Sequence, residues 1–192
     1  MNFDDAVKFH GHACPGLAIG YRVANLAFKE LGGRARDEEL VAIVENNSCA
    51  VDAIQLICGC TFGKGNLIFK DFGKQVYTFI RRPSPDALRI AVKWEPPPEN
   101  PETEAIWQRY AEGDRTREIT TKVQDRKACK MKSVLEADES ELFEVKRIRL
   151  EMPEPARIYK SNTCASCGEK VMETRTRMTG GKMVCIPCSE KE

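Results

Sequence analysis

The stretch His10-Gly11-His12-Ala13-Cys14-Pro15-Gly16 holds both histidines of the chain and one cysteine within five positions. Pro15 suits the first position of a helix, because its missing N–H would have no partner there. We therefore predict a helix that begins after Cys14, with Cys14 as its N-cap, and runs to about Leu31. A helix start favours a thiolate, which is both a metal ligand and a nucleophile. The alternative is a capping loop with two incidental histidines, but neither histidine lies on an apolar periodic face.

Length and composition predict one core domain with a small appended module. The chain has 192 residues, of which 42% are hydrophobic and 31% charged, and its net charge of +1 gives no bulk attraction to nucleic acid or a membrane. The acidic start, Met1 to Asp5, lacks an apolar run, and no stretch is apolar enough to span a membrane. We therefore expect a cytoplasmic protein. Its nine cysteines then indicate metal binding or thiol chemistry rather than disulfides.

Apolar periodicity predicts an α+β fold, a mixed helix and sheet core. Gly32-Gly33 can end the first helix in the left-handed conformation. The short apolar run from Leu40 to Val44 is typical of a strand buried on both faces. Ser48 can cap a second helix. The expected elements after the first helix are a strand over 40–44, a helix over 48–58, and strands over 67–69, 75–80 and 88–94 with a turn at 81–86.

The second predicted helix carries polar and reactive residues along one side. Cys49, Asp52 and Gln55 recur every three residues, so they lie on the same helix face. The loop from Gly59 to Asn66 contains three glycines and Lys64, and its amides could approach an anion, although its spacing is not that of a phosphate loop. The alternative is a tight turn into the next strand. Asp52, Gln55 and Lys64 are the candidate cofactor-binding residues.

The motifs that carry a family resemblance are His10-Gly11-His12-x-Cys14-Pro15-Gly16, Gly20-Tyr21-Arg22, Cys49-x-x-Asp52-Ala53-x-Gln55 and Gly59-Cys60-Thr61-x-Gly63-Lys64-Gly65-Asn66. Together they resemble the FmdE-like family of formylmethanofuran dehydrogenase proteins over roughly residues 1 to 150. The resemblance implies an α+β core, often followed by a zinc-binding tail, and an association with molybdenum or tungsten formylmethanofuran dehydrogenases. It also implies that Cys14, Cys49 and Cys60 belong to one functional surface, whereas Cys58 matches no position of the family pattern.

The segment from Trp94 to Pro101 contains four prolines, so it is predicted to be a stiff connector. Helices are expected from Pro101 to about Glu112 and from Arg115 to Leu135, the latter with Cys129 as a small buried residue. The stretch 115–133 has seven basic and two acidic residues, which indicates either a surface for an acidic partner or a solvated helix face. A strand over 143–150 then ends the core.

Two Cys-x-x-Cys pairs dominate the C-terminal segment. The prolines at 153 and 155 predict the boundary between a core domain over 1–152 and a module over 156–192. Four thiolates in two such pairs bind zinc in a tetrahedron, and the metal stabilises a module too small to fold on an apolar core. We expect a zinc ribbon or treble clef with a hairpin of 172–177 and 182–184 around Gly180-Gly181. The predicted structural zinc ligands are Cys164, Cys167, Cys185 and Cys188.

The core is expected to hold a second metal, since soft sulfur and imidazole suit zinc, copper or iron. His10, His12 and Cys14 are its first candidate ligands. A helix over 48–58 would place Cys49 and Cys60 about 16 Å apart, at about 1.5 Å per residue. We therefore favour Cys49 as the further ligand and treat Cys60 as a mobile second thiol.

Three functions follow from these sites. The first is a metal-binding accessory protein of a molybdenum or tungsten formylmethanofuran or formate-type dehydrogenase, with subunits of that enzyme as partners. The second is a thiol or metal-assisted enzyme acting on a small molecule, with Cys14 as nucleophile, His12 as base and Cys60 as a further catalytic residue. The third is an adaptor whose zinc module binds a protein; nucleic acid is disfavoured, because Tyr159 is the only aromatic residue after position 156. We also expect a homodimer.

Overall fold

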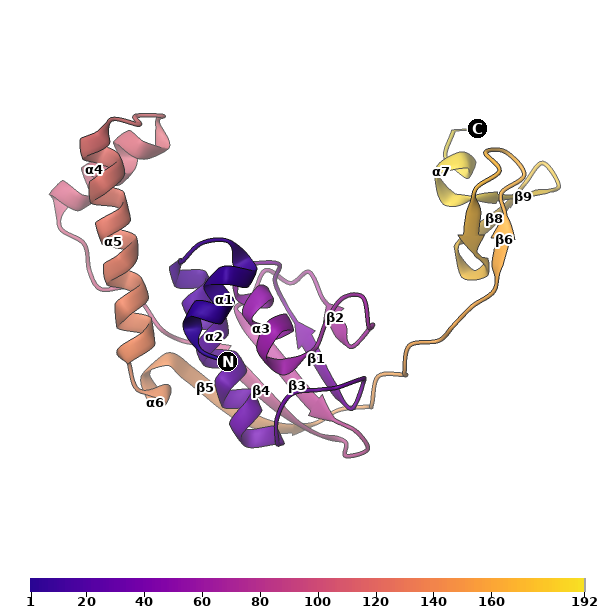
Figure 1. Ribbon diagram of the computed structural model, residues 1–192, viewed down its shortest axis with the longest axis horizontal. Coiled ribbons are helices and arrows are strands. Elements are labelled where there is room, and N and C mark those ends of the chain that lie inside the picture. The colour runs from indigo at the N-terminus through magenta and orange to yellow at the C-terminus, as the bar shows by residue number, and fades with distance from the viewer. Residues whose placement is uncertain (192) are drawn as a thin grey trace. The chain divides into compact units, whose positions relative to one another are not determined.

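The structure is a computed structural model that describes residues 1–191, and the chain divides into two compact units, Met1–Pro155 and a second that begins at Ala156. No helix among the described residues is long and apolar enough to cross a membrane. Mixed helices and sheets confirm the α+β prediction (Figure 1).

The first unit is built on a five-stranded sheet with the order β2-β1-β3-β4-β5. β1 pairs in parallel with β2, and the other pairs are antiparallel. The strands over 40–44 and 67–69 have the expected bounds, whereas the next two are shifted by one or two residues. The strands are β1 Leu40–Val44, β2 Leu67–Phe69, β3 Val76–Arg81, β4 Asp86–Val92 and β5 Phe143–Arg149.

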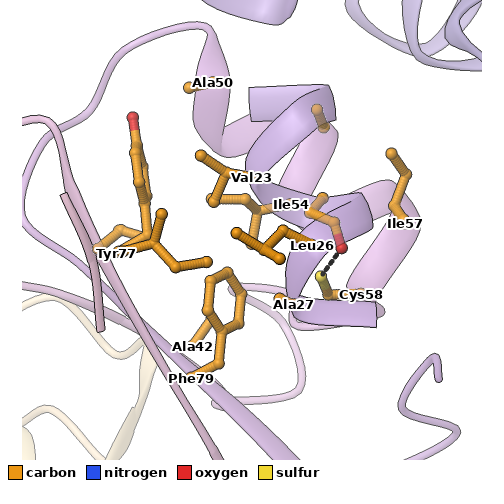
Figure 2. Close-up of a cluster of buried hydrophobic side chains, with 14 of the residues drawn as sticks. Val23, Leu26, Ala27, Ala42, Ala50, Ile54, Ile57, Cys58, Tyr77 and Phe79 are labelled. Atoms are coloured by element: carbon orange, nitrogen blue, oxygen red, sulfur yellow. Dashed lines mark hydrogen bonds between the residues drawn. The ribbon is translucent and has the colours of Figure 1, made fainter. Parts of the chain in front are cut away.

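Three helices cover one face of this sheet (Figure 1): α1 Phe3–His10, α2 Pro15–Leu31 and α3 Ala50–Cys58. Figure 2 shows Val23 of α2 and Ile54 of α3 packed near Phe79 of β3 in the main core. Val41 and Ile80 belong instead to a smaller cluster, to which Leu150 and Met152 contribute. Alternate residues of β1 thus enter two clusters, and all five are buried, as expected for a strand covered on both faces.

Helices α2 and α3 approach each other closely at Gly20. A Cβ atom built there would lie 2.2 Å from the backbone oxygen of Ala50, at the start of α3. No side chain fits in this space, so glycine is what allows the first turns of α3 to lie against α2. This contact sets the spacing between the two helices that carry the motif residues.

The two capping predictions have different outcomes. Cys14 is the N-cap of α2, and Gly32 ends that helix with a φ of 78°, as expected. Ser48 was expected to cap α3, but the N-cap is Cys49, and the Ser48 hydroxyl donates to Asn46 Oδ1 at 2.7 Å. The physical reason is that the Asn46 side chain competes for the serine hydroxyl.

Two helices, α4 Pro101–Ala111 and α5 Arg117–Glu136, form a hairpin after the proline-rich connector, close to the predicted ranges (Figure 1). Arg22 of α2 fastens the end of this hairpin to the core, because its guanidinium donates to the backbone oxygens of Val134, Leu135 and Ala137. A short helix, α6 Glu139–Leu142, leads into β5. Neither α1 nor α6 was predicted, although each begins with a capping box.

The expectation that Cys129 is buried is wrong, because its side chain is exposed. The buried residues of α5 are Ile119, Val123 and Val134. Cys129 follows Val123 by six residues, which at about 3.6 residues per turn takes it off the buried stripe. The helix therefore presents a free thiol to solvent.

The second unit is small and has two two-stranded sheets. Its hairpin turns at Gly180-Gly181 as expected, but the first strand of this hairpin begins at Thr176, because residues 173–175 form a 3₁₀ turn. One cysteine pair follows β6, and the other lies at the end of β9 and in α7, which is a treble-clef arrangement. The elements are β6 Ser161–Thr163, β7 Lys170–Met172, η1 Glu173–Arg175, β8 Thr176–Thr179, β9 Lys182–Cys185 and α7 Ile186–Ser189.

Candidate metal centre

The loop between α1 and α2 places the histidines and the thiol at one point. His10 is the last residue of α1, and Gly11 ends that helix with a φ of 95°, which turns the chain sharply. The chain then returns to Cys14, whose sulfur accepts a hydrogen bond from the Leu17 amide at 3.3 Å. One helix end and one helix start therefore meet across a very short loop.

His10, His12 and Cys14 lie close enough to share one ion. Their ligand atoms all lie within 4.8 Å of one another. The Nε2 atom of His10 is 4.0 Å from the Cys14 sulfur, and the two imidazole rings are 4.5 Å apart between centroids. His10 and Cys14 are half-buried and His12 is exposed, so the group opens to solvent on one side.

Asp52 of α3 fixes the orientation of His10. Its Oδ2 atom lies 2.6 Å from His10 Nδ1, and the His10 side chain is only 11% exposed. A hydrogen bond at Nδ1 leaves Nε2 as the free nitrogen, and Nε2 is the atom that faces Cys14. Gln55 in turn donates to Asp52 Oδ1 at 3.5 Å. Asp52 is a predicted cofactor-binding residue, and the contacts that the structure gives it are with His10 and Gln55.

Cys49 lies beside this group. A Cβ atom built on Gly16 would be 3.3 Å from Cys49 Cβ and 4.0 Å from its sulfur, so Cys49 packs directly against the start of α2. Burial, and then the neighbouring Cys14 thiol, raise the pKa of Cys49. Cys49 is therefore next to Cys14, although its sulfur is outside the set of ligand atoms within 4.8 Å.

Cys60 is separate from the group. Its side chain is fully buried in the main core, and its sulfur donates to the Leu40 backbone oxygen at 3.4 Å. Burial raises its pKa to about 12. A buried thiol held in its neutral form is a poor nucleophile, so the structure does not support a mobile or catalytic Cys60. Cys58 is buried as well, and its sulfur donates to the Ala24 backbone oxygen (Figure 2).

The glycine-rich loop is held by its own contacts. The Lys64 ammonium donates to the backbone oxygens of Arg36 and Asp37, at 3.4 and 3.1 Å. Gln55 Oε1 accepts from the Phe62 amide at 3.3 Å. Lys64 therefore closes a loop instead of reaching the histidine and cysteine group, which matches the alternative of a tight turn before β2. The assignment of Lys64 to a cofactor has no support in these contacts.

The histidine suited to act as a base is also different from the one expected. The sequence pattern suggested His12, which is exposed and contacts the His10 ring. His10 has both the orienting carboxylate and the nitrogen nearest to the thiol. The sequence pattern could not indicate His10 as the base, because its partner Asp52 is 42 residues away in the sequence and meets it only in the folded chain.

The second unit has the better defined metal cluster. The four sulfurs of Cys164, Cys167, Cys185 and Cys188 all lie within 4.8 Å of one another. Backbone N–H groups of residues 167 and 185 lower the pKa of Cys164 to about 6. The Cys185 amide donates directly to the Cys164 sulfur at 3.3 Å. Four converging thiols, one of them stabilised as thiolate, fit a tetrahedral zinc ion.

Comparison with known proteins identifies both units. Residues 9–144 match the family model described as FmdE, Molybdenum formylmethanofuran dehydrogenase operon. Residues 157–192 match the prokaryotic dksA/traR C4-type zinc finger, which together with the cysteine cluster indicates zinc in the second unit.

Two relatives are similar over nearly the whole chain. A protein of Archaeoglobus fulgidus named "Probable S-adenosyl-L-methionine-binding protein" is 32% identical over 197 residues, which cover 96% of this chain and 51% of the relative. This chain thus spans about half the length of that relative. The crystal structure of a tungsten formylmethanofuran dehydrogenase FmdE-like protein from Syntrophus aciditrophicus has a TM-score of 0.65 and 24% identity, covering 100% of this chain and 94% of the other. The latter likeness supports the fold. Since the FmdE model matches well over half of the residues, the chain belongs to the FmdE family.

Proposed function

We propose that this protein is a metal-binding accessory protein of a molybdenum or tungsten formylmethanofuran dehydrogenase system, with a thiophilic ion in its core. His10 Nε2, His12 and the Cys14 sulfur would hold the ion, with the fourth position open to the neighbouring Cys49 or to a ligand from solvent. The observation that carries the proposal is the short contact between Asp52 and His10 Nδ1. A carboxylate on the second nitrogen of an imidazole is the usual support of a metal-binding histidine.

The donor set suits zinc or another thiophilic ion. A thiolate and an imidazole are ligands of intermediate softness, which zinc, copper and iron accept. The exposed side of the group, at His12, leaves room for a further ligand from solvent. Such an open position distinguishes this centre from the second unit, whose four cysteines would close the coordination of zinc.

The second unit is proposed to dock a partner protein. It has seven basic and four acidic residues from 157 to 192, which is a mild excess of positive charge. Nucleic-acid binding needs a stronger basic footprint and aromatic side chains for stacking, and Tyr159 is the only aromatic residue in this range. A component of the dehydrogenase system is therefore the proposed partner.

Metal analysis of purified variants tests the core centre. We expect each wild-type chain to bind one metal ion at the core centre and one zinc ion in the second unit. The Cys14→Ser and His10→Ala variants should lose the core ion and keep the zinc of the second unit. The Cys164→Ser variant should lose only the zinc ion of the second unit. Cys129→Ser is the matched control, because Cys129 is an exposed thiol outside both clusters. A Cys14→Ser protein that retains every equivalent of metal would eliminate the core centre.

A second candidate function is that of a thiol enzyme, because Cys14, His10 and Asp52 follow one another in a chain of side-chain contacts. His10 Nε2 faces the thiol, and Asp52 holds the opposite nitrogen, which is the arrangement of a nucleophile with an oriented base.

In reduced, metal-stripped protein we expect iodoacetamide to alkylate Cys14 faster than the exposed Cys129 at pH 6.5, and zinc to protect Cys14 alone. Peptide mapping after brief alkylation measures both rates, and equal rates would exclude an activated thiol.

A further inference from the structure

A small cavity lies where the α4–α5 hairpin meets the start of α2. It has a volume of about 190 Å³ and is lined by Pro15 of α2, Trp107 of α4, and Arg126, Lys127 and Lys130 of α5. Pro15 directly follows Cys14 in the sequence. A molecule in this cavity would therefore be a near neighbour of the candidate metal centre.

The walls of the cavity suit a flat apolar group. Trp107 is 40% exposed, although its ring stacks on Tyr110 with 5.7 Å between centroids and an angle of 11°. The Trp107 ring, the Pro15 ring and the methylene stems of the lysines present mostly carbon to the cavity. An indole face and a proline ring are surfaces on which another planar group packs well.

The charged groups at the cavity favour an anion. Three cationic side chains line it, mainly through their carbon atoms, and Glu99 is the carboxylate that pairs with the charged groups of two of them. Glu99 accepts from Arg126 Nε at 2.7 Å and lies 2.5 Å from the Lys130 nitrogen. The Lys127 ammonium faces aromatic rings instead, 6.0 Å from the Trp107 centroid. One carboxylate does not balance three cations, so the local charge is positive.

Arg126 has an unused donor. Among residues 1–191, its buried Nη1 atom has no hydrogen-bond partner. Buried polar atoms nearly always have a partner, and guanidinium nitrogens pair best with carboxylates. The guanidinium carbon is 4.9 Å from the Trp107 ring centroid, so a ligand stacked on Trp107 could place a carboxylate near this guanidinium.

We infer that this cavity binds a carboxylate attached to a flat apolar group and holds it beside Cys14. The role as a substrate site rests on the proposed function of the core centre, but binding to the cavity does not. The molecule presented to the core centre would then be an aromatic or similarly planar organic acid rather than a bare inorganic anion.

Fluorescence of Trp107 tests the binding. In a Trp94→Phe background, Trp107 is the sole tryptophan. We expect benzoate to quench it saturably, and benzyl alcohol, which lacks the charge, to bind on the order of tenfold more weakly. Lys127→Gln should weaken benzoate binding several-fold, whereas Lys132→Gln, on the same helix outside the cavity, should not. Equal binding of the two probes, or an unchanged Lys127→Gln protein, would overturn the inference.

Alkylation of the unsubstituted, metal-stripped protein tests the location. Benzoate should slow the labelling of Cys14 by iodoacetamide and leave Cys129 unaffected, and the Lys127→Gln variant should need several-fold more benzoate for the same protection. Protection of Cys129 instead would place the anion in the larger cavity of about 420 Å³ that Cys129, Arg126 and Lys130 also line, and would overturn the inference.

The two proposals fail separately. If Cys14→Ser keeps all of its metal but still shows benzoate quenching, the core metal centre is wrong and the cavity stands. If no variant shows quenching while Cys14→Ser loses the core metal, the cavity is wrong and the metal centre stands.

Discussion

At the level of single residues, the proposed metal binding of the core centre depends on the contact between Asp52 and His10. We predict that Asp52→Asn lowers the affinity of the core for zinc about 10- to 100-fold, the usual loss when the partner of a metal-binding histidine is removed. The amide keeps the size of the carboxylate but loses the charge that holds His10 Nδ1 as a donor. Competition with a chromophoric chelator measures this affinity.

Asp71→Asn is the control for this experiment, because Asp71 is an exposed aspartate outside the candidate ligand groups. The tail zinc should be unchanged in both variants. A core affinity for zinc that is equal in Asp52→Asn and the wild type would show that the contact between Asp52 and His10 does not serve metal binding.

Because the Cys60 thiol is buried, we predict that the free energy of unfolding falls at alkaline pH. Its pKa is raised from an ordinary value of 9.0 to about 12 in the folded protein. The stabilisation from keeping this thiol neutral is complete below pH 9 and is lost as the pH rises through about 12, because the unfolded chain releases the proton first. One such group contributes a slope of about 1.4 kcal/mol per pH unit.

Urea unfolding under reducing conditions between pH 8 and 11 checks this slope. Cys60→Ala should be less stable than the wild type at pH 8, yet its free energy of unfolding should fall less steeply with pH. Cys129→Ala should retain the wild-type slope, since its thiol is exposed in the folded state. Identical slopes in the wild type and Cys60→Ala would contradict the prediction.

At the scale of elements, the close approach of α2 and α3 controls both stability and the site. Gly20→Ala places a methyl group within 2.2 Å of the Ala50 oxygen and within 2.5 Å of its Cα atom, so the helices must separate. We predict a loss of about 1 to 3 kcal/mol in the free energy of unfolding, typical of an overpacked core. The midpoint of urea unfolding measures this loss.

Gly63→Ala is the matched control, because a Cβ atom at Gly63 meets nothing within 4 Å. The same separation would move Cys14 and Asp52 apart, since they belong to the two helices. Gly20→Ala should therefore bind core zinc more weakly as well. If both variants unfold at the wild-type midpoint, the packing of α2 on α3 is looser than the structure indicates.

At the scale of the whole molecule, the two units should respond differently to loss of metal. We predict that a strong chelator unfolds the second unit alone, because its buried apolar cluster consists of Cys164, Val184 and Cys185. The first unit has a large apolar core of many buried side chains; of the candidate core ligands His10, His12 and Cys14, only Cys14 packs against it, at its edge, so the first unit should stay folded without metal. Limited proteolysis should cleave within the second unit, beyond Cys164, only in the chelated protein, and loss of the first unit as well would refute the prediction.

We also propose that the protein is a homodimer. Helix α4 has no buried residue within one chain, and several large aromatic side chains near β2 are exposed, namely Phe62, Phe69 and Phe72. Exposed apolar groups of this size are common at interfaces between protein chains. Light scattering at micromolar concentration should give the mass of two chains, and a monomer at that concentration would exclude the proposal.

The sequence by itself determined the features that depend on neighbours along the chain. The cap at Cys14, the helix stop at Gly32 and the strand at 40–44 follow from local backbone chemistry, so they could be predicted residue by residue. The two Cys-x-x-Cys pairs are equally local, since each pair can present two sulfurs without any distant contact. The helices α4 and α5 were also predicted from local signals, although their pairing as a hairpin was not.

Only the tertiary structure decided which of these residues meet. The contact of Asp52 with His10 joins residues 42 apart and exists because α1 and α3 pack side by side. The burial of Cys60, the exposure of Cys129 and the use of Lys64 to close a loop likewise depend on what packs against each side chain. A motif specifies which chemical groups are present, whereas the orientation of each group and its access to solvent are set by contacts between elements far apart in the chain.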